Sequence, residues 1–253
     1  MTRPSIRPGA RFHIATGLAV GADVALPPEA AHHAARVLRL REGEGVILFD
    51  GTGGEYIATL STIARGEVRA RTLSFVDEDR EPPLRIELIQ GVSSGDRMDD
   101  TVRKATELGV AAISPVFTTR SVVKLDGARA DRRRQHWTAL AVAACEQCTR
   151  NRIPAVAPLQ DFGSWIATLP APVPGEYRLM LAPGAAQRLV ELQPPAAGAA
   201  QLLVGPEGGL SPAEAETAAA RGFVAVRLGP RILRTETAGA TALAVLQTLW
   251  GDF

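Results

Sequence analysis

The sequence predicts an α/β protein of two domains, a small β-barrel over residues 1–76 and a larger α/β domain over residues 84–253. Several short runs of strand-forming residues fill the first part, as in a small barrel. Residues 77–83 are mostly charged and end in two prolines, which favours a linker over a strand or a helix. After this linker strands alternate with helices, which predicts a mostly parallel sheet covered on both faces.

The composition is that of a soluble globular protein, with 46% hydrophobic and 22% charged residues in a chain of 253. It excludes a mostly disordered chain and a collagen-like fibre. Because the chain has only 2 cysteines, it also excludes a disulfide scaffold. No apolar segment follows the N-terminal arginines, and no run is long and apolar enough to span a bilayer. We therefore expect a cytoplasmic protein.

The first domain contains four runs that are expected to form strands and one that is expected to form a helix. A cluster of glycines at 51–54 separates the second and third strands and indicates a hairpin turn. The expected strands are 11–15, 45–50, 55–60 and 67–76, and the expected helix is 28–38.

The second domain changes to alternating strands and helices. Ser211 and Glu214 form a capping box with Pro212 at the first helical position, and Gly222 ends that helix. The other expected helices are 96–108, 131–149 and 236–250, and the expected strands are 85–92, 110–117, 177–182, 201–205 and 223–228.

Ligands of parallel sheets bind at loops beyond the carboxyl ends of the strands, and loops 182–184, 205–209 and 229–235 qualify. The glycines of the second loop allow its backbone to approach a ligand closely. This loop lacks the lysine and the spacing of a phosphate-binding loop and the dinucleotide fingerprint, and Glu207 would repel a diphosphate. A ligand here is therefore not bound chiefly through phosphates. Considered alone, the loop is more typical of a tight strand-to-helix turn.

The segment 228–238 is the most unusual stretch of the sequence. Thr235 can cap the last helix, and Glu236 in its first turn complements the helix dipole. Capping does not account for the two arginines and two apolar residues at positions 231–234, which lie in a loop at the same sheet edge.

Basic residues concentrate between Phe117 and Arg152, where eight basic side chains outnumber three acidic ones. Arginine predominates there, and its planar fork fits phosphate and stacks on bases, which suits RNA. A solvated helix face would explain the charge equally well. The eight residues are Arg120, Lys124, Arg129, Arg132, Arg133, Arg134, Arg150 and Arg152.

No metal site is expected. Cys145 and Cys148 have the spacing of a C-x-x-C motif but fall inside a long apolar helix, so we interpret them as packing residues. The 4 histidines have no metal-ligand spacing.

Two C-terminal motifs, VGPEGGLSPAE at 204–214 and LGPRILRTETA at 228–238, point to a known family. They resemble the RsmE family of ribosomal RNA methyltransferases, of the SPOUT class of knotted methyltransferases. Shorter matches support this resemblance at 96–99, 104–109, 144–148 and 150–154. Residues at 11–12, 33–39 and 48–51 are similar to the family's N-terminal PUA-like β-barrel.

The resemblance implies a SPOUT-type methyltransferase domain with a C-terminal trefoil knot, acting as a homodimer. It implies methylation of N3 of one uridine in 16S ribosomal RNA of the small ribosomal subunit, with S-adenosyl-L-methionine as methyl donor. The donor site that it implies consists of Leu181, Ala182, Pro183, Gly205, Pro206, Glu207, Gly208, Gly209, Leu228, Gly229, Ile232, Leu233, Thr237 and Ala238.

Catalysis of this methyl transfer is expected to depend on positioning together with proton removal or stabilisation of the anion, because uridine N3 is a poor nucleophile until it loses its proton. Arg234 is predicted to stabilise the uracil oxygen that gains charge, Glu236 to accept the proton or orient an arginine, and Arg231 is the next candidate. The barrel and the arginine-rich segment are predicted to bind RNA. The predicted RNA-binding residues are Arg11, Arg36, Arg39, Arg97, Lys104, Arg120, Arg132, Arg133, Arg134, Arg150 and Arg152.

Two alternatives remain at this stage. One is a methyltransferase of the same class that acts on transfer RNA or on a ribose hydroxyl, against which the N-terminal barrel and the 150–154 motif argue. The other is a non-catalytic RNA-binding module, against which the intact glycine loop and the 231–238 segment argue.

Overall fold

The computed structural model describes residues 6–64, 66–122 and 127–253, and the chain divides into two compact units. Unit 1 comprises the chain up to Glu81 together with Val142–Ile153, and unit 2 comprises Pro82–Ala141 and Pro154–Phe253. The sequence analysis assigned residues 142–153 to the second domain. They belong to unit 1 instead: Glu146, near the end of α3 (Gly127–Cys148), accepts from the His13 N–H at 2.9 Å, and the Asn151 side chain accepts from Arg11.

Unit 1 contains a five-stranded sheet in the order β1-β3-β4-β5-β2, in which β1 runs parallel to β3 and the other pairs are antiparallel. The expected strands are all present, and β2 was not predicted. The expected helix at 28–38 is a short α-helix that continues as a π-helical turn. The elements are β1 (Ile6–His13), β2 (Asp23–Ala25), α1 (Pro28–His32), η1 (His33–Val37), β3 (Gly45–Phe49), β4 (Glu55–Ala64) and β5 (Glu67–Val76).

The core of unit 1 lies between this sheet and its helical segment. Phe12 of β1, Leu48 of β3 and Leu60 of β4 are buried together with Ala34 of η1. The glycine cluster at 51–54 forms the predicted turn between β3 and β4, and Gly51, Gly53 and Gly54 have positive φ angles of 85°, 122° and 67°. Glycine adopts these angles without the strain that a side chain would bring.

Unit 2 contains a second sheet in the order β12-β10-β11-β6-β7-β8, with β9 also paired to β7, and each of these pairings is parallel, as predicted. The predicted strands and helices are present, while the short strands β8 and β9, the helix α4 and the 3-10 turn η2 were not predicted. Besides α3, the elements are β6 (Arg85–Gly91), α2 (Arg97–Glu107), β7 (Ala112–Phe117), β8 (Ala155–Val156), β9 (Gln160–Asp161), α4 (Phe162–Thr168), β10 (Tyr177–Leu181), η2 (Leu189–Glu191), β11 (Ala199–Val204), α5 (Pro212–Ala220), β12 (Val224–Val226) and α6 (Thr235–Trp250).

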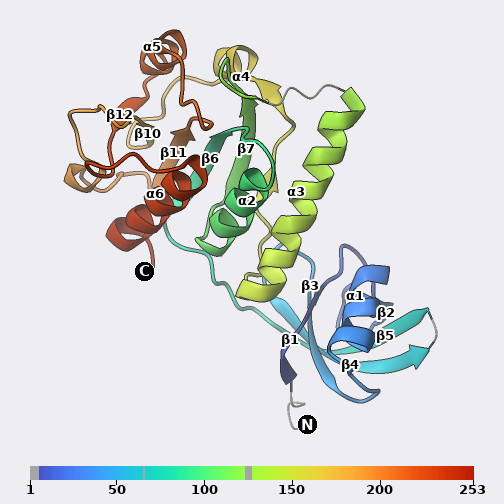
Figure 1. Ribbon diagram of the computed structural model, residues 1–253. Coiled ribbons are helices and arrows are strands. Elements are labelled where there is room, and N and C mark those ends of the chain that lie inside the picture. The colour runs from blue at the N-terminus through green and yellow to red at the C-terminus, as the bar shows by residue number, and fades with distance from the viewer. Residues whose placement is uncertain (1–5, 65, 123–126) are drawn as a thin grey trace. The chain divides into compact units, whose positions relative to one another are not determined.

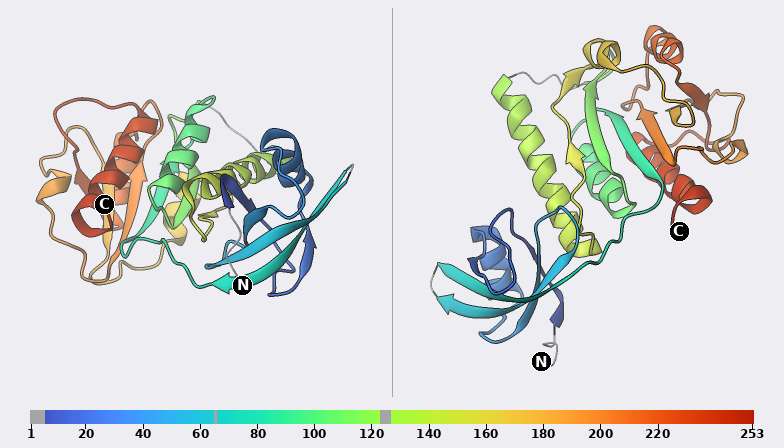
Figure 2. Two further views of the ribbon diagram at one scale, coloured as in Figure 1. Left: turned by 90° about the horizontal axis from the view of Figure 1, so that it is seen from below. Right: turned by 180° about the vertical axis from the view of Figure 1, so that it is seen from behind.

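Helices cover both faces of this sheet (Figures 1 and 2). Helices α2 and α6 pack together on one face. On the other face Trp165 of α4 and Ala218 of α5 pack with Ile89 of β6 and Leu203 of β11. Alternate residues of each strand point to opposite faces, so the near-continuous hydrophobic strands follow from burial on both sides. No helix in the described part of the chain is long and apolar enough to cross a membrane.

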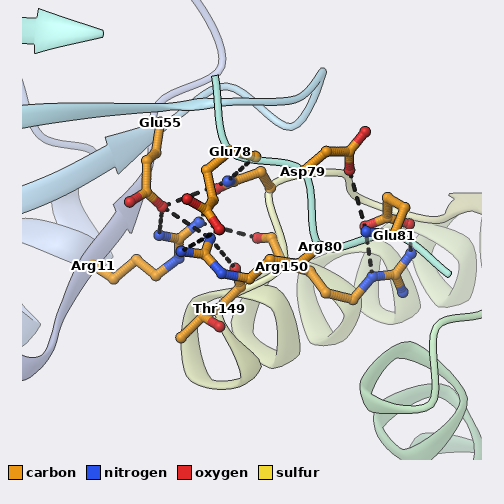
Figure 3. A network of polar contacts seen from close by, with 9 residues as sticks. Arg11, Glu55, Glu78, Asp79, Arg80, Glu81, Thr149 and Arg150 are labelled. Atoms are coloured by element: carbon orange, nitrogen blue, oxygen red, sulfur yellow. Dashed lines mark hydrogen bonds and ion pairs between the residues drawn. The ribbon is translucent and has the colours of Figure 1, made fainter. Parts of the chain in front are cut away.

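A buried network of charges holds unit 1 together (Figure 3). Arg11 of β1 and Arg80 of the segment after β5 both donate to Glu55 Oε2, at 2.8 Å and 3.1 Å. Arg150, which follows α3, pairs with Glu81 through two hydrogen bonds, one of them 2.9 Å from Nε to Oε1. These contacts tie the first strand, the predicted linker and the 142–153 segment into one unit.

The Glu55 carboxylate gives unit 1 a stability that depends on pH. Burial raises the pKa of Glu55, but hydrogen bonds from Arg11 and Arg80 outweigh burial and hold the pKa below its ordinary value of 4.5. Because the pKa is lower in the folded chain, the stabilisation is fully present above the unfolded pKa and declines as pH falls through the folded one. We predict that Glu55→Gln lowers the free energy of unfolding at pH 7 by about 3 kcal/mol, and that its difference from wild type shrinks below pH 4.5.

Urea unfolding of both proteins between pH 7 and pH 3 checks this prediction. Glu78→Gln is the matched control, because the Glu78 carboxylate is half-exposed and 3.7 Å from Arg80, so its loss should change the free energy by less than about 1 kcal/mol. A difference for Glu55→Gln that stays constant from neutral to acid pH would contradict the assignment.

Candidate functional site

A cavity of about 680 Å³ opens in unit 2 at the carboxyl ends of the parallel strands. The loops after β10, β11 and β12 line it, together with the first turn of α6. These are the three loops singled out from the sequence, and they converge because parallel strands end at one edge of the sheet.

The cavity brings together most of the residues predicted for a donor site and all three predicted catalytic residues. Thr237 is the exception, since it is exposed in the first turn of α6 and does not line the cavity. The residues that line the cavity are Arg97, Arg120, Met180, Leu181, Ala182, Pro183, Val204, Gly205, Pro206, Glu207, Gly208, Gly209, Leu210, Ala215, Val226, Arg227, Leu228, Gly229, Arg231, Ile232, Leu233, Arg234, Thr235, Glu236 and Ala238.

The glycine loop after β11 folds back on itself. The Gly209 N–H donates to the Pro206 carbonyl at 2.8 Å. A Cβ on Gly205 would lie 2.9 Å from the backbone of Gly209, and a Cβ on Gly91 at the end of β6 would lie 2.5 Å from the Pro206 ring. Glycine is therefore required at both positions by the close approach of backbones. From the sequence the loop glycines were expected to admit a ligand, and Gly91 was not singled out.

Glu207 in this loop is held by the segment that follows β6. Its Oε1 accepts from the Ser94 N–H at 2.9 Å, from the Ser94 hydroxyl at 2.7 Å and from Arg97 at 3.0 Å. Burial raises the pKa of Glu207, but these hydrogen bonds and the Arg97 charge outweigh burial and lower it. Glu207 is thus a charged anchor of the loop, and Arg97, predicted to bind RNA, serves in that anchor.

A second set of contacts holds the loop from the segment after β7. Arg120 donates to the Gly208 carbonyl at 2.7 Å. The predicted capping box of α5 is confirmed, since Ser211 and Glu214 exchange hydrogen bonds between side chain and backbone. Glu214 also accepts from the Thr119 N–H at 2.7 Å, so that α5 is joined to the same segment.

The segment 231–234 presents its charge at the mouth of the cavity. Arg231 and Arg234 are exposed, and within the described chain neither side chain makes a hydrogen bond or an ion pair. Ile232 is 85% exposed although it is apolar. Glu236 Oε2 is buried and has no hydrogen-bond partner among the described residues. A ligand in the cavity would therefore meet two available cations and one available carboxylate oxygen.

The prediction that Thr235 caps α6 is wrong. Arg234 is the N-cap residue and Thr235 is the first residue of the helix. The Thr235 hydroxyl turns inward, donates to the Gly205 carbonyl at 2.7 Å and accepts from Gln90 at 2.9 Å. Gln90, near the end of β6, was not singled out from the sequence, because one amide side chain forms no motif.

Two of the predicted RNA-binding residues need correction. The guanidinium of Arg11 is buried between Glu55 and the Asn151 side chain and lies 4.5 Å from the centre of the Phe49 ring. Arg150 is buried in its pair with Glu81. Neither can meet a phosphate without breaking unit 1, because separating one partner of a buried pair leaves an uncompensated charge.

The other predicted RNA-binding residues keep exposed or half-exposed side chains. Arg152 donates to the Thr52 carbonyl at 2.6 Å and is about half-exposed. Lys124 lies outside the described residues. Besides Arg97, which is half-buried, the exposed residues are Arg36, Arg39, Lys104, Arg120, Arg132, Arg133, Arg134 and Arg152.

Cys145 lies as the packing interpretation expects, whereas Cys148 is half-buried. Cys145 is buried in α3, and burial raises the pKa of its thiol to about 12, which disfavours the reactive thiolate. Among the described residues no group of three histidine, cysteine or acidic side chains could hold a metal ion.

Comparison with known proteins agrees with this architecture. The RNA methyltransferase domain family matches residues 80–247, and the RNA methyltransferase PUA domain family matches residues 26–73. Unit 1 thus contains a PUA domain and unit 2 the greater part of an RNA methyltransferase domain, so the chain is built as an RNA methyltransferase.

Relatives that match along most of their length identify the family more specifically. Ribosomal RNA small subunit methyltransferase E of Bacillus subtilis is 33% identical over 86% of this chain and 87% of its own length. The protein of the same name from Mycobacterium bovis is 34% identical over 94% of this chain and 91% of its own. The chain belongs to the ribosomal RNA small subunit methyltransferase E family.

Solved structures share the fold. That of ribosomal RNA small subunit methyltransferase E from Neisseria gonorrhoeae, bound to S-adenosyl methionine, is 42% identical, covers 96% of this chain and 98% of its own, and has a TM-score of 0.87. A methyltransferase of Legionella pneumophila, in complex with SAM, is 36% identical, covers 96% of this chain and 99% of its own, and has a TM-score of 0.89.

The close contact between Gly91 and Pro206 predicts that a methyl group added at Gly91 destabilises the fold, whereas one added at an open glycine does not. Gly91→Ala places a Cβ 2.5 Å from the Pro206 ring, so we expect the free energy of unfolding to fall by about 1–3 kcal/mol, as in other overpacked sites. Gly184→Ala, whose Cβ meets nothing within 4 Å, is the control and should change it by less than about 0.5 kcal/mol. Urea unfolding measures both, and equal values for the two variants would refute the close approach.

Proposed function

We propose that this chain methylates N3 of a uridine in 16S ribosomal RNA of the small ribosomal subunit, with S-adenosyl-L-methionine as methyl donor. The observation that carries the proposal is the cavity in which the glycine loop, the loop after β10 and the 228–238 segment converge. The names of the relatives and the SAM in the two solved structures support the donor and the ribosomal substrate. The resemblance described above is the basis for N3 of uridine.

The cavity fits a donor without phosphates. The loop at 205–209 offers backbone groups and no basic side chain, and its one charge is the anchored Glu207. The apolar side chains of Leu181, Ile232 and Leu233 line the same space and would flank the adenine ring. When bound, the donor supplies a methyl group on a positively charged sulfur. The neutral thioether that remains after transfer is a good leaving group.

The protein must then prepare the acceptor. Uridine N3 carries a proton, and its removal places negative charge on the uracil oxygens. Arg234, exposed at the mouth of the cavity, would stabilise that charge, with Arg231 beside it. Glu236 lines the cavity with Oε2 lacking a partner among the described residues, which suits it to accept the proton or to orient an arginine.

The substrate is long, so binding would extend beyond the cavity. Exposed arginines on α3, including Arg132 and Arg133, would contact phosphates, while the PUA-like domain would contribute Arg36 and Arg39. Arg11 and Arg150 are left out because they are buried.

We further propose that the enzyme acts as a homodimer and that its C-terminal segment is knotted, as the resemblance implies. The apolar residues of α6 add little support for the dimer, because several of them are buried inside this chain. Ala242, Leu243 and Leu246 are buried within this chain, and Trp250 stacks on Tyr177, which leaves Leu249 as an exposed apolar residue of that helix.

The proposed activity predicts one product. Purified protein, S-adenosylmethionine and small ribosomal subunits from cells that lack the enzyme should yield 3-methyluridine in 16S ribosomal RNA, detected by mass spectrometry of nucleosides. The yield should not change when a chelator removes divalent ions from protein and donor before subunits are added, because the described residues form no metal site. Methylation of a ribose hydroxyl, or of transfer RNA alone, would favour the alternative substrate class.

The proposed roles of Arg234 and Glu236 predict a pH-dependent rate. Methyl transfer should accelerate as pH rises, because N3 must lose its proton. Arg234→Ala should lower the single-turnover rate about a hundredfold, equivalent to about 3 kcal/mol, with little change in donor affinity. Glu236→Gln should slow the rate if Glu236 accepts the proton.

Single-turnover rates at saturating donor, measured against pH, check both roles. Arg188→Ala is the control, because Arg188 is half-exposed, lies 3.9 Å from Glu191 and does not line the cavity. Near-normal rates for both Arg234→Ala and Glu236→Gln would move the catalytic assignment to other residues.

Binding of RNA through α3 predicts a change in salt dependence. Each phosphate contact removed should flatten the slope of log K against log salt by roughly 0.7–0.9. Replacing Arg132 and Arg133 by alanine should therefore lower the slope by up to about 2 units. Arg103→Ala is the control, because Arg103 is half-exposed on α2 and is already paired with Asp100 at 2.9 Å. If the double variant keeps the wild-type slope and affinity, these arginines are a solvated helix face.

A further inference from the structure

A chain of hydrogen bonds beneath the cavity joins three segments that are far apart in the sequence. Gln90 Nε2 at the end of β6 donates to the Gly91 carbonyl at 3.0 Å and to the Thr235 hydroxyl at 2.9 Å. The Thr235 hydroxyl in turn lies 2.7 Å from the Gly205 carbonyl. Gln90 and Thr235 are both buried, so water does not compete for these bonds.

The direction of each bond in this chain is fixed by chemistry. The Gly91 carbonyl can only accept, so the Gln90 amide must present its NH₂ group on that side. The second N–H of the same group then points at Thr235 Oγ1, which must accept it. The single hydroxyl proton of Thr235 is therefore left to donate to the Gly205 carbonyl. No alternative arrangement satisfies all three contacts.

The connected segments carry the two halves of the proposed reaction. Gly205 begins the loop that would hold the donor. Thr235 lies between Arg234 and Glu236, which would act on the acceptor base. The hydrogen bond from the Thr235 hydroxyl to the Gly205 carbonyl thus connects the donor loop directly to the segment that carries Arg234 and Glu236.

The surroundings of Gln90 indicate that its amide has a role other than filling space in the core. Gln90 Oε1 is buried without a hydrogen-bond partner among the described residues, and burying such an oxygen is unfavourable for folding. An apolar side chain of similar size would avoid that penalty. A Cβ on Gly239 of α6 would lie 3.4 Å from Oε1, at van der Waals distance, so this helix packs directly beside the amide. Buried polar groups of this kind occur where function opposes stability.

We propose that Gln90 and Thr235 are positioning residues for methyl transfer, which hold the donor loop in register with Arg234 and Glu236. The inference rests on the proposed function, because it assigns the two halves of the reaction to these segments. Neither side chain needs to touch donor or RNA. The reaction depends on alignment of the methyl group with N3, and a displacement of about 1 Å between reacting groups can lower a rate about a hundredfold.

The test compares variants of Thr235 in full-length protein, with small ribosomal subunits and S-adenosylmethionine both saturating. Thr235→Val keeps the shape of the side chain and removes both hydrogen bonds. We expect its single-turnover rate to fall between about tenfold and a hundredfold, with the slope of rate against pH unchanged. Thr235→Ser retains the hydroxyl and should remain within about threefold of wild type.

Two further variants separate positioning from stability. Thr248→Val is the matched control in the same helix, because the exposed Thr248 hydroxyl donates to the Ala244 carbonyl and, among the described residues, to no other group. The rate of this variant should equal that of wild type. Gln90→Met removes the amide that donates to Thr235 and leaves Thr235 itself unchanged. If the two residues act as one unit, Gln90→Met combined with Thr235→Val should be no slower than the slower single variant.

The inference is overturned if Thr235→Val reacts within twofold of wild type, or if Thr235→Ser is as slow as Thr235→Val. Should Thr235→Val not fold, the rate of Gln90→Met decides in its place, and a wild-type rate rejects the inference. Failure of the proposed function has a different signature, because the wild-type protein would then show no methyl transfer to the RNA.

Discussion

The Thr235 hydroxyl is the contact on which the organisation of the cavity depends. It joins the first turn of α6 to the Gly205 carbonyl and, through Gln90, to the end of β6. Each partner lies at the carboxyl edge of a sheet whose strands are all parallel, so the backbone brings them to one place before any side chain acts. The side-chain bonds then fix distances that the backbone leaves variable.

Other contacts complete the same framework from the outside. Glu207 is anchored by Ser94 and Arg97, and the Gly208 carbonyl by Arg120. The loop after β11 is therefore held on three sides by residues from the ends of β6 and β7 and from α6. Such a loop is prepared for a ligand before it binds, and the ordering entropy that binding would otherwise cost is lower. This suits a reaction in which positioning provides most of the catalysis.

The sequence predicted the secondary structure and the site where local patterns determine them. The parallel strands, the capping box at Ser211 and the three converging loops all follow from periodicity and turn chemistry. The short segments β2, β8, β9 and α4 were missed, because a few residues carry no periodic pattern. The knot and the dimer stay predictions, since neither is visible in local sequence.

The errors have a common physical origin in long-range pairing. Arginine was interpreted by its affinity for phosphate, yet Arg11 and Arg150 find carboxylates more than 40 residues away in sequence and become buried. Thr235 was interpreted as a helix cap, but Gln90 and Gly205 offer its hydroxyl better partners than the helix does. Polar side chains of this kind can be assigned only when the fold has brought their partners together.

The central claim is that these loops form a donor site that exists before the donor binds. A crystal structure of the protein with S-adenosylmethionine tests it most directly. The account predicts the adenosyl group between the 205–209 loop and the 228–238 segment, with the contact between Thr235 and the Gly205 carbonyl retained. A donor bound elsewhere, or a 205–209 loop that has moved and broken this contact, would contradict it.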